Sequence, residues 1–235
     1  MNSDIILPAV ITLMVISFFI IVTRVFGSIR QIKLTTKLIG LLCLGDFLFF
    51  QIVFASKGLW EIKSCLPLHM CDISLIVCGM TLLYQRQSHF EFVYFWGIIG
   101  AVSALLFPTF LISPTGFWYY HFYIGHGLIL LSVFWALFVL KLRPKPGSAM
   151  KVLAYSQLFL PTVSGINWLL GSNYMFLTEL PETTPFGSFR AFPWSLLVFE
   201  IAAIICFSLL SLPLRKQKKP KSSHVKLSNF SKMIP

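Results

Sequence analysis

Long apolar stretches alternate with short polar ones along the whole chain. Each stretch is close to the roughly 20 residues that a helix needs to cross a bilayer. Helices are the expected form, because backbone polar groups in lipid must be satisfied within the segment. The pattern predicts an all-α polytopic membrane protein with seven transmembrane helices, over Ile5–Gly27, Lys37–Ser56, Leu66–Tyr84, Phe92–Ile112, Tyr119–Leu140, Met150–Leu170 and Phe192–Leu214.

Composition supports a single membrane domain over residues 1–214. Of the 235 residues 57% are hydrophobic and only 11% are charged, and the mean hydropathy is +0.81. A soluble domain of this size does not need so much apolar surface. We therefore expect a multi-pass protein of the cell membrane. The five cysteines show no CxxC spacing, so neither a structural zinc site nor a redox dithiol is indicated.

The distribution of basic residues predicts the orientation. With seven spans, 16 of the 19 Lys and Arg residues fall on one side, and only Lys57, Lys63 and Arg190 fall on the other. Since cytoplasmic loops are enriched in Lys and Arg, the N-terminus is expected outside and the C-terminus in the cytoplasm.

The C-terminal segment 215–235 is basic and poor in apolar residues. We expect a disordered cytoplasmic tail that contacts anionic lipid headgroups. No folded module or interleaved aromatic pattern accompanies the charge, so nucleic-acid binding is not expected despite the net charge of +11.

Polar residues gather in the predicted outer halves of several helices. At 1.5 Å of rise per residue, they lie about 5–12 Å below the outer helix ends. Polar groups at membrane depth are costly and tend to face a cavity or a partner, so a common buried site is expected there. Its candidate residues are His69, Cys71, Asp72, His126, Asn167 and Glu200. Asp46 is expected deeper, about 15 Å below its helix end.

Cys71 is the candidate nucleophile. A nucleophilic thiol needs a base that takes its proton, and His126 and His69 are the available bases in this layer. Asp72, Asn167 or Glu200 would orient the base or an acyl carbonyl. The structural alternatives are that His126 hydrogen-bonds between helices and that Cys71 is an inert apolar residue.

Two further expectations concern the outer surface and metals. Residues 173–177, which begin with Asn173, are apolar without periodicity and are interpreted as an outer lid over the site, or as an ordinary loop anchored by aromatic residues. The histidines show no HxxxH or HxH spacing, so neither a metal nor another cofactor is expected.

Four motifs carry a resemblance to a known family. They are Leu-Pro-Leu-His-Met-Cys-Asp-Ile-Ser (66–74), Phe-Pro (107–108), Tyr-Ile-Gly-His-Gly (123–127) and Asn-Trp-Leu-Leu-Gly-Ser-Asn-Tyr-Met-Phe-Leu (167–177) followed by a proline. In this order they resemble the YwaF-like bacterial integral membrane proteins, over roughly Trp60 to Leu214.

More distantly, the pattern is similar to a eukaryotic transmembrane acyltransferase family that remodels ether phospholipids. It is also similar to the androgen-induced and androgen-dependent membrane hydrolases, which cleave fatty-acid esters of hydroxy fatty acids. These groups use a Cys or Thr nucleophile with a membrane histidine, and the resemblance implies that role for His126. The acyltransferase thiol lies between the Pro and the His of the first motif. Leu68 occupies that position here and cannot act, which leaves Cys71, one turn further on.

Three functions stay open from the sequence. The first is a lipid acyltransferase or lipid-ester hydrolase using Cys71 and His126 on membrane lipid. The second is a transporter or binding protein for a small solute or a proton-coupled substrate, with His126 and Glu200 as relay groups. The third is a non-catalytic lipid-interacting scaffold. Hydrogen-bond reach between Cys71 and His126 inside a cavity would favour the enzyme. The sequence does not determine the oligomeric state.

Overall fold

The structure is a computed structural model that describes residues 3–110, 116–182, 184, 189 and 191–212. Over these residues the chain is all-helical, without a strand, and Glu179 and Ala191 form one isolated antiparallel β-bridge. The elements are α1 (Ser3–Phe26), α2 (Ile29–Ser56), α3 (Met70–Tyr84), α4 (Gln87–Phe92), the π-helix η1 (Val93–Gly97), α5 (Ile98–Leu106), α6 (Gly116–Phe138), α7 (Ser148–Leu170), the 3-10 turn η2 (Tyr174–Phe176) and α8 (Trp194–Ser211). Because α4, η1 and α5 are continuous, the described residues form seven long helical segments, and the predicted all-α class is confirmed.

Five of these segments are long and apolar enough to cross a membrane: α1, α2, α4–η1–α5, α6 and α8. α3 is apolar but has only 15 residues. α7 has 23 residues but is not among the five, because Lys151, Gln157 and Asn167 lower its hydropathy. Spanning by α3 and α7, and the side of the membrane that each terminus faces, therefore stay predictions. The predicted basic tail lies outside the described residues.

Three helix starts differ from the prediction by four residues or more: those of α2, of α3 and of the α4–η1–α5 segment, which begins at Gln87 rather than Phe92. α2 begins at Ile29 rather than Lys37, because Ser28 forms a capping box with Gln31. The Ser28 hydroxyl accepts from the Gln31 N–H, and the Gln31 side chain accepts from the Ser28 N–H at 2.8 Å. Arg30 and Lys33 therefore lie on the first turns of α2.

α3 begins at Met70 rather than Leu66, so His69 is its N-cap and not a helical residue. The preceding segment is held in a turn by Tyr174. The Tyr174 hydroxyl accepts from the Leu66 N–H at 3.0 Å and donates to the Ile62 carbonyl at 2.6 Å. A phenol is protonated at neutral pH and can donate, and burial raises the pKa of Tyr174 further.

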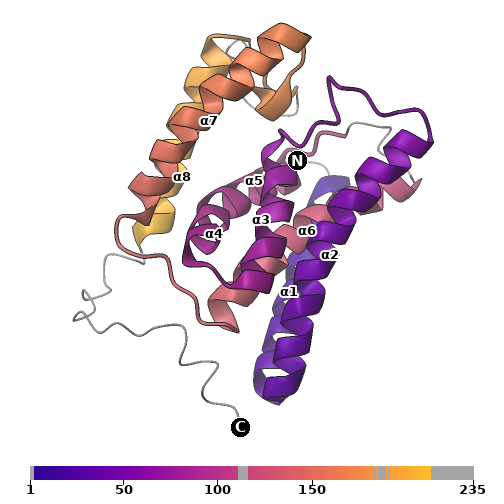
Figure 1. Cartoon of the computed structure of the whole chain (residues 1–235), viewed down its shortest axis with the longest axis vertical. Helices are drawn as coiled ribbons and strands as arrows, with labels where there is room; N and C mark the ends of the chain where they lie inside the picture. The colour runs from indigo at the N-terminus through magenta and orange to yellow at the C-terminus, as the bar shows by residue number, and fades with distance from the viewer. Residues whose placement is uncertain (1–2, 111–115, 183, 185–188, 190, 213–235) are drawn as a thin grey trace.

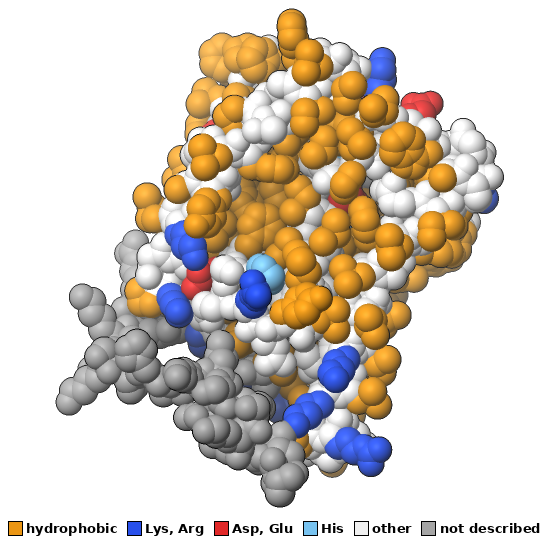
Figure 2. All heavy atoms as spheres, viewed as in Figure 1, with side chains coloured by type: hydrophobic (Ala, Val, Ile, Leu, Met, Phe, Trp, Pro, Cys, Tyr) orange, Lys and Arg blue, Asp and Glu red, His pale blue; other side chains and the backbone are white. Residues whose placement is uncertain are grey.

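The helices are arranged as a central group with a pair on either side (Figure 1). α3, α4, α5 and α6 lie in the middle, and α2 packs most extensively on α3 while α1 packs on α6. α7 and α8 pair with each other on the opposite side. Large apolar side chains are exposed along α1, α2 and α8, and the face in Figure 2 is mostly hydrophobic. These exposed faces suit contact with lipid.

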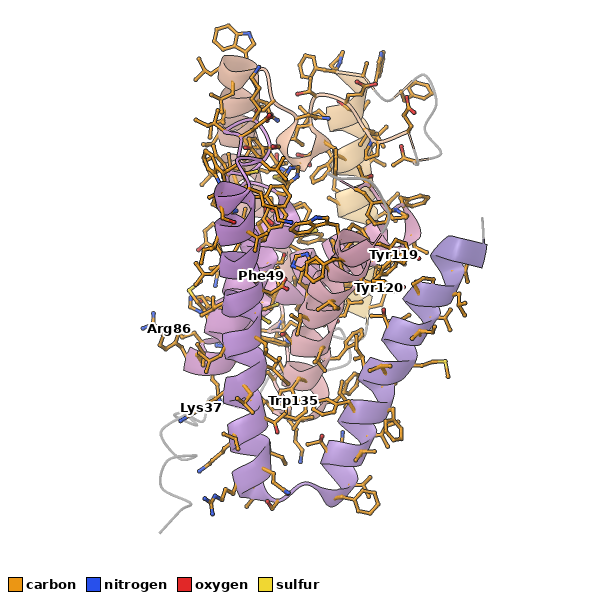
Figure 3. All side chains as sticks on the ribbon, turned by 90° about the vertical axis from the view of Figure 1, so that its right-hand side faces the viewer. Lys37, Phe49, Arg86, Tyr119, Tyr120 and Trp135 are labelled. Carbon is orange, nitrogen blue, oxygen red and sulfur yellow. The ribbon has the colours of Figure 1, made fainter. Side chains whose placement is uncertain are left out.

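The two ends of the bundle differ in charge. We call one the basic end; it holds the start of α2 and the α3–α4 turn, with Lys37 and Arg86 low in Figure 3. In Figure 2 most of the visible Lys and Arg side chains lie toward this end. We call the opposite end the lid end; it consists of the loop 57–69 and the segment 171–182 that contains η2. The cavity described below lies toward the lid end.

Close packing of α2 on α3 depends on Gly79. A Cβ there would lie 2.6 Å from Leu44 Cγ and 2.9 Å from the Gly40 carbonyl oxygen. The backbone atom cannot move away without separating the helices, so Gly79→Ala is expected to destabilise the fold by about 1–3 kcal/mol. Thermal unfolding of the detergent-purified protein measures this loss of stability. Gly165→Ala is the control, because nothing lies within 4 Å of its Cβ position. Equal melting temperatures for both variants would contradict the packing argument.

Candidate functional site

A cavity of about 480 Å³ lies between the helices toward the lid end. Its walls come from α2, α3, η1, α5, α6, η2 and α8. Most of the wall is apolar and rich in phenylalanine, with a few polar side chains among them, which is the usual character of a small-molecule or lipid site. The ionisable residues on the wall are Asp46, His69, Cys71, Asp72, His121 and His126.

Cys71 and His126 meet in this cavity. Cys71 Sγ lies 3.1 Å from His126 Nε2, and His126 Nδ1 lies 2.7 Å from the Phe122 carbonyl oxygen. A carbonyl oxygen can only accept, so Nδ1 carries the ring hydrogen and Nε2 is left as an acceptor. The thiol therefore donates to Nε2, and the imidazole is oriented to receive the thiol proton.

The local sequence explains how both side chains reach this position. Cys71 is the second residue of α3, at the end of the helix that faces the cavity. His126 lies between Gly125 and Gly127, where added Cβ atoms would lie 3.1 Å from an Asp46 carboxylate oxygen and 3.0 Å from the Thr12 methyl group. The two glycines thus let α2 and α1 approach α6 closely. The glycines can therefore serve close helix packing, as the sequence suggests, while His126 between them lines the cavity.

His69 and Asp72 also line the cavity, but only Asp72 belongs to α3. His69 precedes α3, and its Nδ1 accepts from the Met175 N–H at 3.4 Å. The Asp72 carboxylate accepts a hydrogen bond from the His69 backbone N–H, as expected of an acidic residue in the first turn of a helix. His69 therefore links the start of α3 to η2, and Asp72 holds the helix N-terminus beside Cys71.

Asn167 and Asn173 shape the lid and do not line the cavity. The Asn167 side chain, 3% exposed, donates to the Tyr174 carbonyl at 2.9 Å and accepts from the Tyr174 N–H at 2.8 Å. Asn173 accepts from two backbone N–H groups, those of Thr178 and Glu179. Their hydrogen bonds hold η2 so that its Met175 and Phe176 line the cavity.

Glu200 lies elsewhere. Its carboxylate accepts from Gln157 Nε2 at 3.0 and 3.1 Å, which joins α8 to α7. Phe199, one residue before it, lines the cavity, and Glu200 does not. The expectation that Glu200 orients the base or the carbonyl is corrected here, because depth along a helix does not determine the direction in which a side chain points.

The sequence did not single out the pair of Asp46 and His121 as site residues. Asp46 Oδ1 lies 3.1 Å from His121 Nε2, and both side chains are mostly buried in the cavity wall. The two helix ends are staggered: in Figure 3 the start of α6, marked by Tyr119 and Tyr120, lies level with Phe49, which is in the last third of α2. Depths measured from each helix end therefore place Asp46 too far from His121.

Within the described residues, no group of three His, Cys, Asp or Glu side chains is placed to hold a metal ion. The five cysteines are free thiols. The chemistry that this site offers comes from a thiol–imidazole pair and a carboxylate–imidazole pair in an apolar chamber.

Over the described residues the fold defines an all-helical membrane protein, with several apolar helices around a mostly apolar cavity that holds a few ionisable side chains. The chain belongs to the TMEM164 family, whose sequence profile matches residues 2–211. No curated protein and no solved structure matches the chain. The similarity to YwaF-like proteins and to the more distant groups stays an expectation from the sequence.

Proposed function

We propose that this protein is a membrane lipid acyltransferase or lipid-ester hydrolase, with Cys71 as the nucleophile and His126 as the general base. The observation that carries the proposal is the 3.1 Å contact between Cys71 Sγ and His126 Nε2 inside a cavity of about 480 Å³. In this proposal the protein crosses the cell membrane seven times, with its N-terminus outside and the site in the outer half of the helix bundle.

The first half-reaction follows from the geometry. His126 Nε2 takes the thiol proton, and the thiolate attacks the carbonyl carbon of a lipid ester. As the C–S bond forms and the ester C–O bond breaks, the leaving alcohol takes the proton from Nε2. The Phe122 carbonyl steadies the imidazolium by accepting from Nδ1. Backbone N–H groups in the first turn of α3 favour negative charge on the carbonyl oxygen.

The apolar walls suit an acyl chain. A second cavity of about 210 Å³ shares Met70, Trp96 and Met175 with the main one and is otherwise almost entirely apolar. Its additional walls are contributed by α3, α4 and α7. A chain bound with its ester at Cys71 would extend along these apolar residues, which favours a lipid over a small polar substrate.

The transporter alternative loses one of its expected relay groups. Glu200 hydrogen-bonds to Gln157 outside the cavity, so it does not form a proton path with His126. As partners we propose membrane lipid as the substrate and anionic headgroups at the basic end and tail.

A trapped thioester tests the proposal. The full-length protein in detergent is mixed with a glycerophospholipid that carries an alkyne-tagged ester-linked acyl chain, quenched with acid and analysed by mass spectrometry. We expect one tagged acyl group on Cys71 that hydroxylamine releases. Cys71→Ser is expected to abolish it, whereas Cys206→Ser, on α8 and not on the cavity wall, is expected to retain it. Folded protein without an adduct, or with the adduct on another cysteine, would reject the assignment.

A further inference from the structure

The cavity holds a second pair of ionisable side chains, Asp46 and His121, that the first half-reaction does not use. Asp46 Oδ1 lies 3.1 Å from His121 Nε2, with 12% of the Asp46 side chain and 15% of the His121 side chain exposed. A carboxylate buried to this degree in a membrane bundle is costly unless it is paired. Both residues line the same cavity as Cys71 and His126.

The second pair lies nearer to the lid end than the first. His121 precedes His126 by five residues on α6, which corresponds to about 7–8 Å along the helix axis. The Asp46 carboxylate faces Gly125, beside His126. Both Asp46 and His121 are close enough to interact electrostatically with His126. The two pairs therefore serve one chamber at different depths.

Aromatic rings fix the orientation of His121. The ring centroids of Phe49, Phe50, Phe117 and Trp118 lie 5.7–6.1 Å from the His121 ring. With Nε2 facing Asp46, the other nitrogen, Nδ1, lies across the ring from the carboxylate. The 3.1 Å approach of Asp46 Oδ1 to His121 Nε2 is an ion-pair contact and not a hydrogen bond. A carboxylate at this distance stabilises the imidazolium that forms when the ring takes a proton.

Before acylation, both ring nitrogens of His126 are engaged. Its Nδ1 is bonded to the Phe122 carbonyl and its Nε2 faces the sulfur. Once Cys71 carries an acyl group, a hydroxyl compound that approaches from the lid end meets His121 first. A base at that position is suited to the second half-reaction rather than to the first.

We propose that His121, oriented by Asp46, is the general base that activates the acceptor hydroxyl compound, either the free hydroxyl of a lysophospholipid or water. This inference rests on the proposed function. The acceptor O–H gives its proton to His121, and its oxygen attacks the thioester carbonyl carbon. The new C–O bond forms, the C–S bond breaks, and Cys71 leaves as the thiolate. The proton on His121 returns through the cavity to the thiolate and restores the thiol, so no electrons are gained or lost.

The test separates formation of the thioester from its decay. Full-length wild type, His121→Gln and Asp46→Asn are mixed with the alkyne-tagged phospholipid, and the Cys71 adduct is followed over time. One arm contains lysophosphatidylethanolamine, and the other contains water alone. For both variants we expect thioester formation within about twofold of wild type and decay slowed by about 100-fold or more, in the range attributed to a general base. The arm in which wild-type decay is fast identifies the acceptor.

Two further variants keep the test decisive. His89→Gln, on α4 and not on the cavity wall, is expected to match wild type in both steps. His121→Ala removes the base, and added imidazole is expected to restore thioester decay, a rescue that a purely structural role would not give. Equal loss of both steps, or normal decay in folded His121→Gln, would overturn the role of His121. No thioester in wild type would overturn the proposed function itself, and this inference with it.

Discussion

Replacing His126 with glutamine is expected to slow thioester formation on Cys71 by about 100-fold or more. The imidazole is placed to take the thiol proton, since Nε2 lies 3.1 Å from Cys71 Sγ and Nδ1 is held by the Phe122 carbonyl. Positioned general bases contribute about 10²–10⁴-fold to rate. Glutamine keeps hydrogen-bonding capacity at this site but cannot take the proton. The early time course of the tagged adduct measures the effect.

His69→Gln is the informative comparison for this prediction. His69 lines the same cavity, but its Nδ1 is bonded to the Met175 backbone N–H. If His69 were the base, His69→Gln would show the larger loss. Undiminished adduct formation in folded His126→Gln would remove His126 from the mechanism.

Asn167→Leu is expected to give the largest loss of stability among single changes at the lid end, about 3 kcal/mol or more. The side chain makes three hydrogen bonds, to the Tyr174 carbonyl, the Tyr174 N–H and the Ser172 hydroxyl. Leucine leaves two buried backbone groups without these partners, and each unsatisfied buried group costs about 1–3 kcal/mol. Denaturant unfolding measures the loss, and hydrogen exchange should report faster opening of segment 172–177.

Trp168→Leu is the matched control, since the neighbouring side chain is 83% exposed and no hydrogen bond is lost. Asn167→Asp should fall between the two, because the carboxylate still accepts from the Tyr174 N–H but cannot donate to its carbonyl. A loss below about 1 kcal/mol for Asn167→Leu would mean that other contacts hold η2.

Hydropathy and depth account for much of what the sequence predicts correctly. The helical stretches appear because each must satisfy its backbone internally, and polar residues stand out against an apolar background. Depth from the helix ends was enough to bring Cys71 and His126 into one layer, where the structure places them 3.1 Å apart. A thiol and an imidazole are rare enough at that depth for their types to indicate chemistry.

The direction of a side chain and the relative height of two helices were not predictable in the same way. Glu200 bonds to Gln157, while its neighbour Phe199 faces the cavity. Asp46 seemed too deep because α2 extends past the start of α6. Both depend on contacts between helices that are distant in sequence, so no local pattern records them.

The start of α3 shows a third limit. Pro67 suits a first helical turn, yet the helix begins three residues later because Tyr174, more than a hundred positions away, binds the segment before it. His69 thereby becomes a cap residue. A long-range hydrogen bond overrides a local preference here.

The shortness of α3 has a consequence for how a substrate reaches the sulfur. With 15 residues it is about 22 Å long, against about 30 Å for the hydrocarbon thickness of a bilayer. Its neighbour α2 has 28 residues. At the end where α3 stops short of its neighbours, the loop 57–69 and η2 complete the cavity wall, and Cys71 lies in the first turn of the helix at this end. In the proposed seven-span topology, the glycerol ester linkages that border the hydrocarbon lie near the level of the thiol. We therefore propose that a phospholipid presents its carbonyl by lateral diffusion within the leaflet.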